Sequence, residues 1–191
     1  MSAFSFYPTK VLGAFGDGGM IMTNSPRLAL KARMLRMYGI KREYYSEFPG
    51  YNSRLDELHA AILRHKLQKL APAIKKRQAL AKQYYANLKG TPLALPIPDP
   101  KATHAYHLFV VRHKKREAIL RFMETHGITL SVSYRHPLHL MRGFRFLGYK
   151  KGDFPVAEET VREIFSLPLY PGLRLRDQKK IIKTLKQFDW D

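Results

Sequence analysis

The residue with the clearest chemical potential is Lys10, which ends the segment SFYPTK (residues 5–10) and is followed by four glycines between residues 13 and 19. An amine that aromatic neighbours shield from water loses its charge more easily, and the neutral amine can attack a carbonyl carbon. A lysine at an arbitrary position is more often a solvated surface residue. The pattern alone therefore leaves a nucleophilic and a purely structural role open.

Other reactive groups are few. The chain has no cysteine, which excludes disulfides, thiolate nucleophiles and cysteine-ligated metals. His104 and His107 have the spacing of a metal-binding pair, but on a strand they would point to opposite faces. His136 and His139 flank Pro137 without an acidic or cysteine neighbour. We therefore expect no metal site.

The charge is strongly positive. Lysine and arginine number 34 against 15 acidic residues, a formal charge of +19 in 191 residues, and residues 58–98 hold eight basic residues and no acid. This charge indicates either a basic surface that is simply solvated or a module that binds anionic partners. No nucleic-acid-binding motif accompanies the charge, so we expect no specific nucleic-acid partner.

The pattern in the first half predicts a hairpin around the glycines, with a strand at residues 20–23 and a turn that needs positive φ at glycine. A helix should start at Pro26, with Ser25 as its cap, and stop at Gly39. Residues 40–51 are expected to form a loop. Helical spacing of leucines then covers residues 55–70, capped by Asn52 or Ser53, and a second helix runs from Pro72 to residue 88.

The second half begins after a proline-rich segment, residues 92–100, which is the best internal boundary. Strands are expected at residues 106–111 and 128–132, and an extended apolar segment at 167–171. Helices are expected at 114–126, 153–165 and 177–188. The order strand–helix–strand–helix predicts a small α/β layer.

Five blocks, in order along the chain, carry a family resemblance: residues 5–19 (SFYPTKVLGAFGDGG), 50–63 (GYNSRLDELHAAIL), 103–109 (THAYHLF), 137–140 (PLHL) and 147–171 (LGYKKGDFPVAEETVREIFSLPLYP). The sequence resembles the sugar aminotransferases of the DegT/StrS type, which are fold type I enzymes that use pyridoxal phosphate (PLP). The resemblance covers only the C-terminal half of such an enzyme. It implies an α/β fold made of the tail of the large domain (residues 1–53), connecting helices (54–91) and a small α/β domain (92–191).

The resemblance also implies roles for individual residues. Lys10 corresponds to the catalytic lysine, which holds PLP covalently and later moves a proton. Ser5 corresponds to a hydroxyl that binds the PLP phosphate. Asn52 corresponds to an amide that reaches the phosphate of the neighbouring subunit's cofactor, which implies a homodimer, although Asn52 is also a good helix cap. Arg54, Tyr134 and His139 correspond to positions near the substrate, where each could equally be a structural residue.

The implied reaction is amination of a nucleotide-linked keto sugar, with an amino acid, glutamate being expected, as donor. This serves surface-polysaccharide or related sugar pathways in the cytoplasm. No secretory leader or membrane-spanning segment is expected. The alternatives are a non-catalytic fragment that lacks the cofactor-binding N-terminal half, does not retain PLP and self-associates through exposed apolar surface, and a basic module for anionic partners.

Overall fold

The computed structural model describes residues 1–190, and within them the chain forms two compact units that divide between Ala73 and Ile74. This division differs from the boundaries that we placed at residues 54 and 92. The proline-rich segment lies inside the second unit, because Leu93 is buried in its core and Ala94 pairs with Arg112. The two units are described separately.

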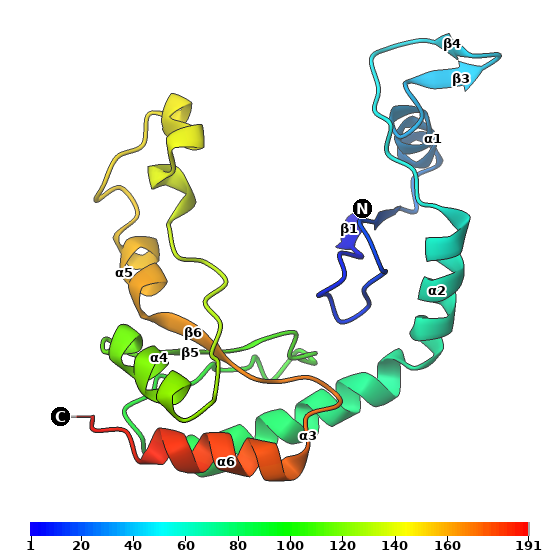
Figure 1. Cartoon of the computed structure of the whole chain (residues 1–191). Coiled ribbons are helices and arrows are strands. Elements are labelled where there is room, and N and C mark those ends of the chain that lie inside the picture. Colours follow the sequence, from blue (N-terminus) through cyan, green and yellow to red (C-terminus); the bar gives the residue numbers. More distant parts are fainter. Residues whose placement is uncertain (191) are drawn as a thin grey trace. The chain divides into compact units, whose positions relative to one another are not determined.

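The first unit begins with an antiparallel pair, β1 (Ser2–Ser5) and β2 (Gly19–Met22), in which Ser2 lies opposite Met22 and Ser5 opposite Gly19. Helix α1 (Pro26–Leu35) follows (Figure 1). Ser25 caps it as predicted, since its hydroxyl accepts a hydrogen bond from the N–H of Leu28 at 3.4 Å.

The loop expected at residues 40–51 contains a second small hairpin, formed by β3 (Ile40–Arg42) and β4 (Tyr45–Ser46). Its two turn residues, Glu43 and Tyr44, have φ of 51° and 57°. Turns of this kind usually carry glycine or asparagine. Glu43 and Tyr44 are not residues that signal such a turn, so the hairpin could not be recognised. The prediction of a loop at residues 40–51 was wrong.

Two long helices follow, α2 (Glu57–Gln68) and α3 (Leu70–Leu88). The capping prediction was wrong: Asp56 is the N-cap residue of α2, four residues after Asn52, and its side chain makes no cap hydrogen bond. Helix α3 starts two residues before Pro72, which therefore sits in the first turn, where its missing N–H costs no helical hydrogen bond.

The second unit is built on β5 (Phe109–Arg112) and β6 (Ile164–Leu167), which pair antiparallel with Phe109 opposite Leu167. The strand expected at residues 128–132 is reduced to one bridge between Ser131 and Ser166. The helix expected to run through residue 165 ends earlier, because Phe165 belongs to β6.

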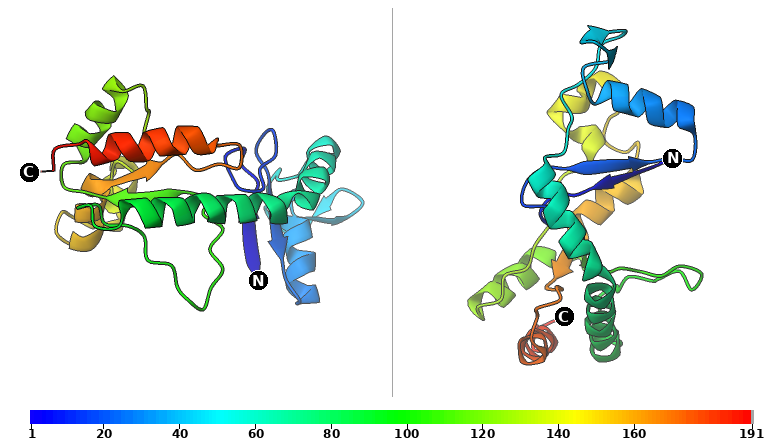
Figure 2. Two further views of the ribbon diagram at one scale, coloured as in Figure 1. Left: turned by 90° about the horizontal axis from the view of Figure 1, so that it is seen from below. Right: turned by 90° about the vertical axis from the view of Figure 1, so that its right-hand side faces the viewer.

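Three helices complete the core of this unit: α3, α4 (Arg116–Thr125) and α6 (Leu175–Lys186). Figure 2 shows α3 and α6 side by side, and the Gln178 side chain on α6 donates to the carbonyl of Leu80 on α3 at 2.8 Å. Helix α5 (Pro155–Glu163) precedes β6, and two short 3-10 helices, η1 (Leu138–Leu140) and η2 (Arg142–Leu147), precede α5. Within residues 1–190 no helix has both the length and the apolar character that crossing a bilayer requires.

Candidate functional site

Lys10 ends a tight turn that starts at Tyr7. The N–H of Lys10 donates to the carbonyl of Tyr7 at 2.9 Å, and Pro8 occupies the second turn position, for which its fixed φ is suited. The N–H of Tyr7 in turn donates to the Ser5 hydroxyl at 3.3 Å. Ser5 and Lys10 thus lie on one hydrogen-bonded segment, and both side chains are exposed. Shielding of the Lys10 amine by its aromatic neighbours, which we considered above, is not found.

This segment packs on helix α2. Phe6 is buried with Ala14 and with Leu63 of α2, and its backbone N–H and carbonyl bond to Gly18 and Ala14 at 2.8 and 2.7 Å. The Lys66 ammonium, also on α2, donates to the carbonyl of Gly13. The helix therefore fixes the course of the chain on both sides of Lys10, while the lysine side chain itself is exposed.

The glycines that follow Lys10 allow close packing. A Cβ on Gly13 would lie 2.5 Å from the Pro8 carbonyl oxygen, and one on Gly16 would lie 2.8 Å from Cε1 of His59. Neither glycine has a positive φ, so the conformational reason that we predicted for the glycine block was wrong. His59 and Lys66 support the lysine loop and were not identified from the sequence. The only signal for them was their position on the predicted helix at residues 55–70.

Asn52 and Arg54 form a second group in this unit. Nε of Arg54 donates to Oδ1 of Asn52 at 3.0 Å, and the guanidinium lies 5.8 Å from the ring centre of Tyr38. The two side chains line a cavity of about 570 Å³ at the start of α2, together with Leu55, Asp56 and Glu57. Within residues 1–190 no hydrogen bond or ion pair links this group to Ser5 or Lys10.

Tyr134 and His139 lie in the second unit and differ in their surroundings. Tyr134 is 66% exposed and belongs to no helix or strand. His139 is buried on η1, where Nε2 lies 3.0 Å from Oε1 of Glu158 and the ring packs edge-on against Phe154. Glu158, which lies 19 residues further along the chain, is an acidic partner that the sequence neighbourhood of His139 did not reveal.

The Glu158 carboxylate is held by its own loop as well. Oε1 accepts the backbone N–H of Gly152 at 2.8 Å. This hydrogen bond is the main reason why the pKa of Glu158 is lowered, and the hydrogen bond to His139 acts in the same direction, against the opposing effect of burial. The pair His139–Glu158 ties η1 to α5 in the segment that follows Tyr134.

Comparison with known proteins decides the family. Residues 1–186 match the DegT/DnrJ/EryC1/StrS aminotransferase family. The chain belongs to this family. A DegT/DnrJ/EryC1/StrS relative from Micromonospora megalomicea subsp. nigra, dTDP-3-amino-3,4,6-trideoxy-alpha-D-glucose transaminase, is 43% identical over 97% of the chain, which corresponds to 51% of the relative. The chain spans about half the length of the curated relatives that it matches.

Two solved structures share the fold of this chain. DesV of S. venezuelae, solved in complex with a ketimine intermediate, is 39% identical and superposes with a TM-score of 0.93 over 97% of this chain and 50% of its own. NtdA of Bacillus subtilis, solved with bound cofactor PMP, is 26% identical with a TM-score of 0.86 over 97% and 45% of the two chains. The expected fold class, a mixed α/β portion of such a transferase, is confirmed.

Proposed function

We propose that this chain supplies the lysine-bearing half of a PLP-dependent aminotransferase that aminates a nucleotide-linked keto sugar, with glutamate as the expected donor. The observation that carries the proposal is the Lys10 turn. The turn is anchored on α2, and it presents an exposed amine that has no ion-pair partner within residues 1–190. The family match and the relatives' activities on dTDP and UDP sugars support the same assignment.

The residues fit the cofactor. A phosphorylated aldehyde needs an accessible amine and hydrogen-bond donors for its phosphate, and Lys10 and Ser5 supply an amine and a hydroxyl from one exposed segment. When bound, PLP would supply an electron sink. Nζ of Lys10 would hold the cofactor and afterwards move the proton, while the Ser5 hydroxyl would orient the phosphate.

The Asn52–Arg54 pair would act at the site of a second copy. The Asn52 amide would donate to the phosphate of the neighbouring subunit's cofactor, while its Oδ1 keeps the bond to Arg54 that is already present. The Arg54 guanidinium would attract an acidic donor or a substrate phosphate. Exposed apolar side chains on β1 and β2, among them Phe4 and Ile21, fit contact with further protein, either the remainder of a transferase or a second copy.

In the second unit, we propose that Tyr134 contacts the sugar. His139 would not contact the sugar but would position the loop that carries Tyr134. The Tyr134 hydroxyl is exposed and can donate to a ligand, whereas the His139 ring is buried and bonded to Glu158. His139 would therefore act on the substrate only through the loop that carries Tyr134.

Amino transfer tests the proposal. The chain is mixed with a polypeptide equivalent to the half of the M. megalomicea relative that it does not match. Release of 2-oxoglutarate from glutamate is then followed with PLP and a dTDP-linked keto sugar. We expect transfer with the chain and none with Lys10→Ala, while the exposed control Lys114→Ala keeps it. Two results would favour the alternative of a non-catalytic fragment. One is equal activity of the unmodified chain and both variants. The other is no activity in any of them although the two polypeptides associate.

A further inference from the structure

A groove of about 480 Å³ lies between α3 and α6 in the second unit, and none of the residues assigned above lines it. Its apolar part is formed by Leu175 and Ile182. Amide side chains surround it, from Gln83 and Asn87 on α3 and from Gln178 and Gln187. Three lysines of α6 complete the lining: Lys179, Lys183 and Lys186.

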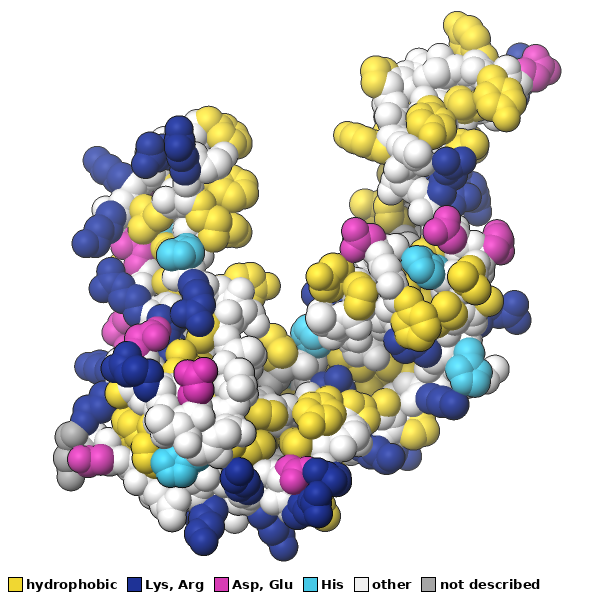
Figure 3. Space-filling model, in the orientation of Figure 1, with side chains coloured by type: hydrophobic (Ala, Val, Ile, Leu, Met, Phe, Trp, Pro, Cys, Tyr) yellow, Lys and Arg dark blue, Asp and Glu magenta, His cyan; other side chains and the backbone are white. Residues whose placement is uncertain are grey.

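The two helices that form the groove carry an unusual concentration of positive charge. Helix α3 has four basic residues and no acid, and α6 has five basic residues and one acid. That acid, Asp177, is already paired with Arg174 and Arg176. In Figure 3, lysine and arginine side chains crowd the lower border of the molecule, where α6 runs.

The three groove lysines are exposed, and in the described part of the chain none of them has an ion-pair partner. They are spaced four and three residues apart, so they repel one another on one face of α6. The helix dipole stabilises cations in the last turn of α6, where Lys183 and Lys186 lie. Lys179 lies outside that turn, so the dipole does not offset its repulsion. A bound anion would remove this repulsion.

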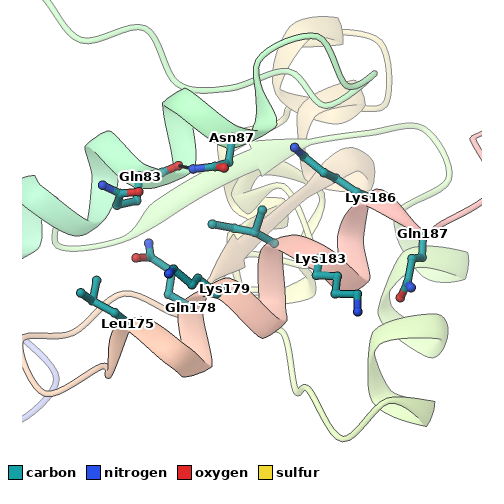
Figure 4. Close-up of a pocket in the computed structure, with 9 residues that line it drawn as sticks. Gln83, Asn87, Leu175, Gln178, Lys179, Lys183, Lys186 and Gln187 are labelled. Atoms are coloured by element: carbon teal, nitrogen blue, oxygen red, sulfur yellow. Dashed lines mark hydrogen bonds between the residues drawn. The ribbon is translucent and has the colours of Figure 1, made fainter.

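We propose that the groove binds a nucleoside di- or triphosphate. The row from Lys179 to Lys186 extends over about 10 Å of helix, which matches a chain of two or three phosphates. In Figure 4 the Lys186 side chain points from α6 back toward α3, on the side of Asn87. The apolar part of the groove suits a flat base, and the Gln83 and Gln187 side chains beside it can bond to the base's polar groups, whereas the amides of Gln178 and Asn87 already donate to backbone carbonyls.

The lining favours a small molecule over a nucleic acid. None of its nine residues is aromatic, whereas grooves for single strands usually stack bases on aromatic rings. The volume is also in the range that a single small ligand fills. The site lies in the second unit and the Lys10 turn in the first, so this proposal stands or falls independently of the proposed function.

Calorimetric titration of the whole chain with ADP and ATP tests the proposal, with adenosine and a single-stranded oligonucleotide as comparison probes. Lys179→Ala and Lys186→Ala each remove one phosphate contact. Lys180→Ala is the matched control, since Lys180 is an exposed lysine of α6 that does not line the groove. We expect saturable binding of ADP that weakens about tenfold in the two groove variants and stays unchanged in the control.

Three results would overturn it. One is the absence of saturable ADP binding at millimolar concentration. Another is an equal loss of affinity in all three variants, because the lysines would then act only through overall charge. The third is tighter binding of the oligonucleotide than of ADP in direct competition, which would identify the face as a nucleic-acid surface.

Discussion

Gly13 lies directly against the carbonyl oxygen of Pro8, so closely that a Cβ at residue 13 would come within 2.5 Å of that oxygen. The contact joins the two arms of the loop that presents Lys10, and Lys66 of α2 holds Gly13 from the other side. The atoms nearest to such a Cβ belong to the backbone of Tyr7 and Pro8. No side-chain rotation could therefore make room for it. The course of the lysine turn therefore depends on a residue three positions after the lysine.

Gly13→Ala should accordingly deform the Lys10 turn. We expect a loss of stability of the first unit of about 2 kcal/mol, because backbone must shift to relieve the contact. Urea denaturation measures this change. Gly143→Ala is the control, since no atom lies within 4 Å of a Cβ at that position. Equal midpoints for the two variants would contradict the account of the turn.

The His139–Glu158 pair makes stability depend on pH. Because the pKa of Glu158 is lowered from its ordinary value of 4.5, chiefly by the Gly152 N–H, the ionised carboxylate stabilises the folded state. This contribution is complete above about pH 4.5 and is lost as the pH falls through the lowered pKa. Denaturation curves of the chain and of Glu158→Gln should therefore differ at pH 6 and converge toward pH 3.

The matched control for this pH series is Glu159→Gln, which removes the same charge from an exposed neighbour. It should follow the unmodified chain over the whole pH range. A constant difference between Glu158→Gln and the unmodified chain from pH 6 to pH 3 would mean that ionisation of Glu158 does not stabilise the fold.

Arg77 links α3 to two distant segments of the second unit. Its buried Nη1 donates to the carbonyls of Leu169, Tyr106 and His107 at 2.8, 3.1 and 3.3 Å, and burial lowers the pKa of the guanidinium. Arg77→Met would remove this donor from the buried Leu169 carbonyl and from the half-buried carbonyls of Tyr106 and His107. We expect a loss of about 3 kcal/mol in the free energy of unfolding. Lys82→Met, on an exposed face of the same helix, should change it by less than about 0.5 kcal/mol.

Features with a local cause could be predicted from the sequence. Ser25 before Pro26 marks the start of α1, and the spacing of Ile181, Ile182 and Leu185 marks the buried face of α6. In each case the physical signal lies within a few residues. The lysine segment is different, because its role follows only from the family resemblance, and neither the expected shielding of Lys10 nor the expected positive φ at the glycines is found.

Features that depend on distant partners could not be predicted. Strand β5 pairs with β6 (Ile164–Leu167), whose first two residues continue directly from α5 and carry the helical pattern expected through residue 165, whereas Leu167 is expected to be extended. Pairing with β5 outweighs the local helical pattern there. His139 looked like an unpaired loop histidine because Glu158 comes close only in the folded second unit. The position of His59 against Gly16 is likewise a result of tertiary packing.

If Lys10 is the cofactor lysine, it should be the lysine of this chain that reacts with PLP. The chain is incubated with one equivalent of PLP and reduced with borohydride, and the modified peptide is identified by mass spectrometry. We expect a single dominant label on Lys10, which Lys10→Ala abolishes and Lys114→Ala leaves unchanged. Labelling scattered over the exposed lysines, with no preference for Lys10, would contradict the assignment of Lys10 as the cofactor lysine of this chain.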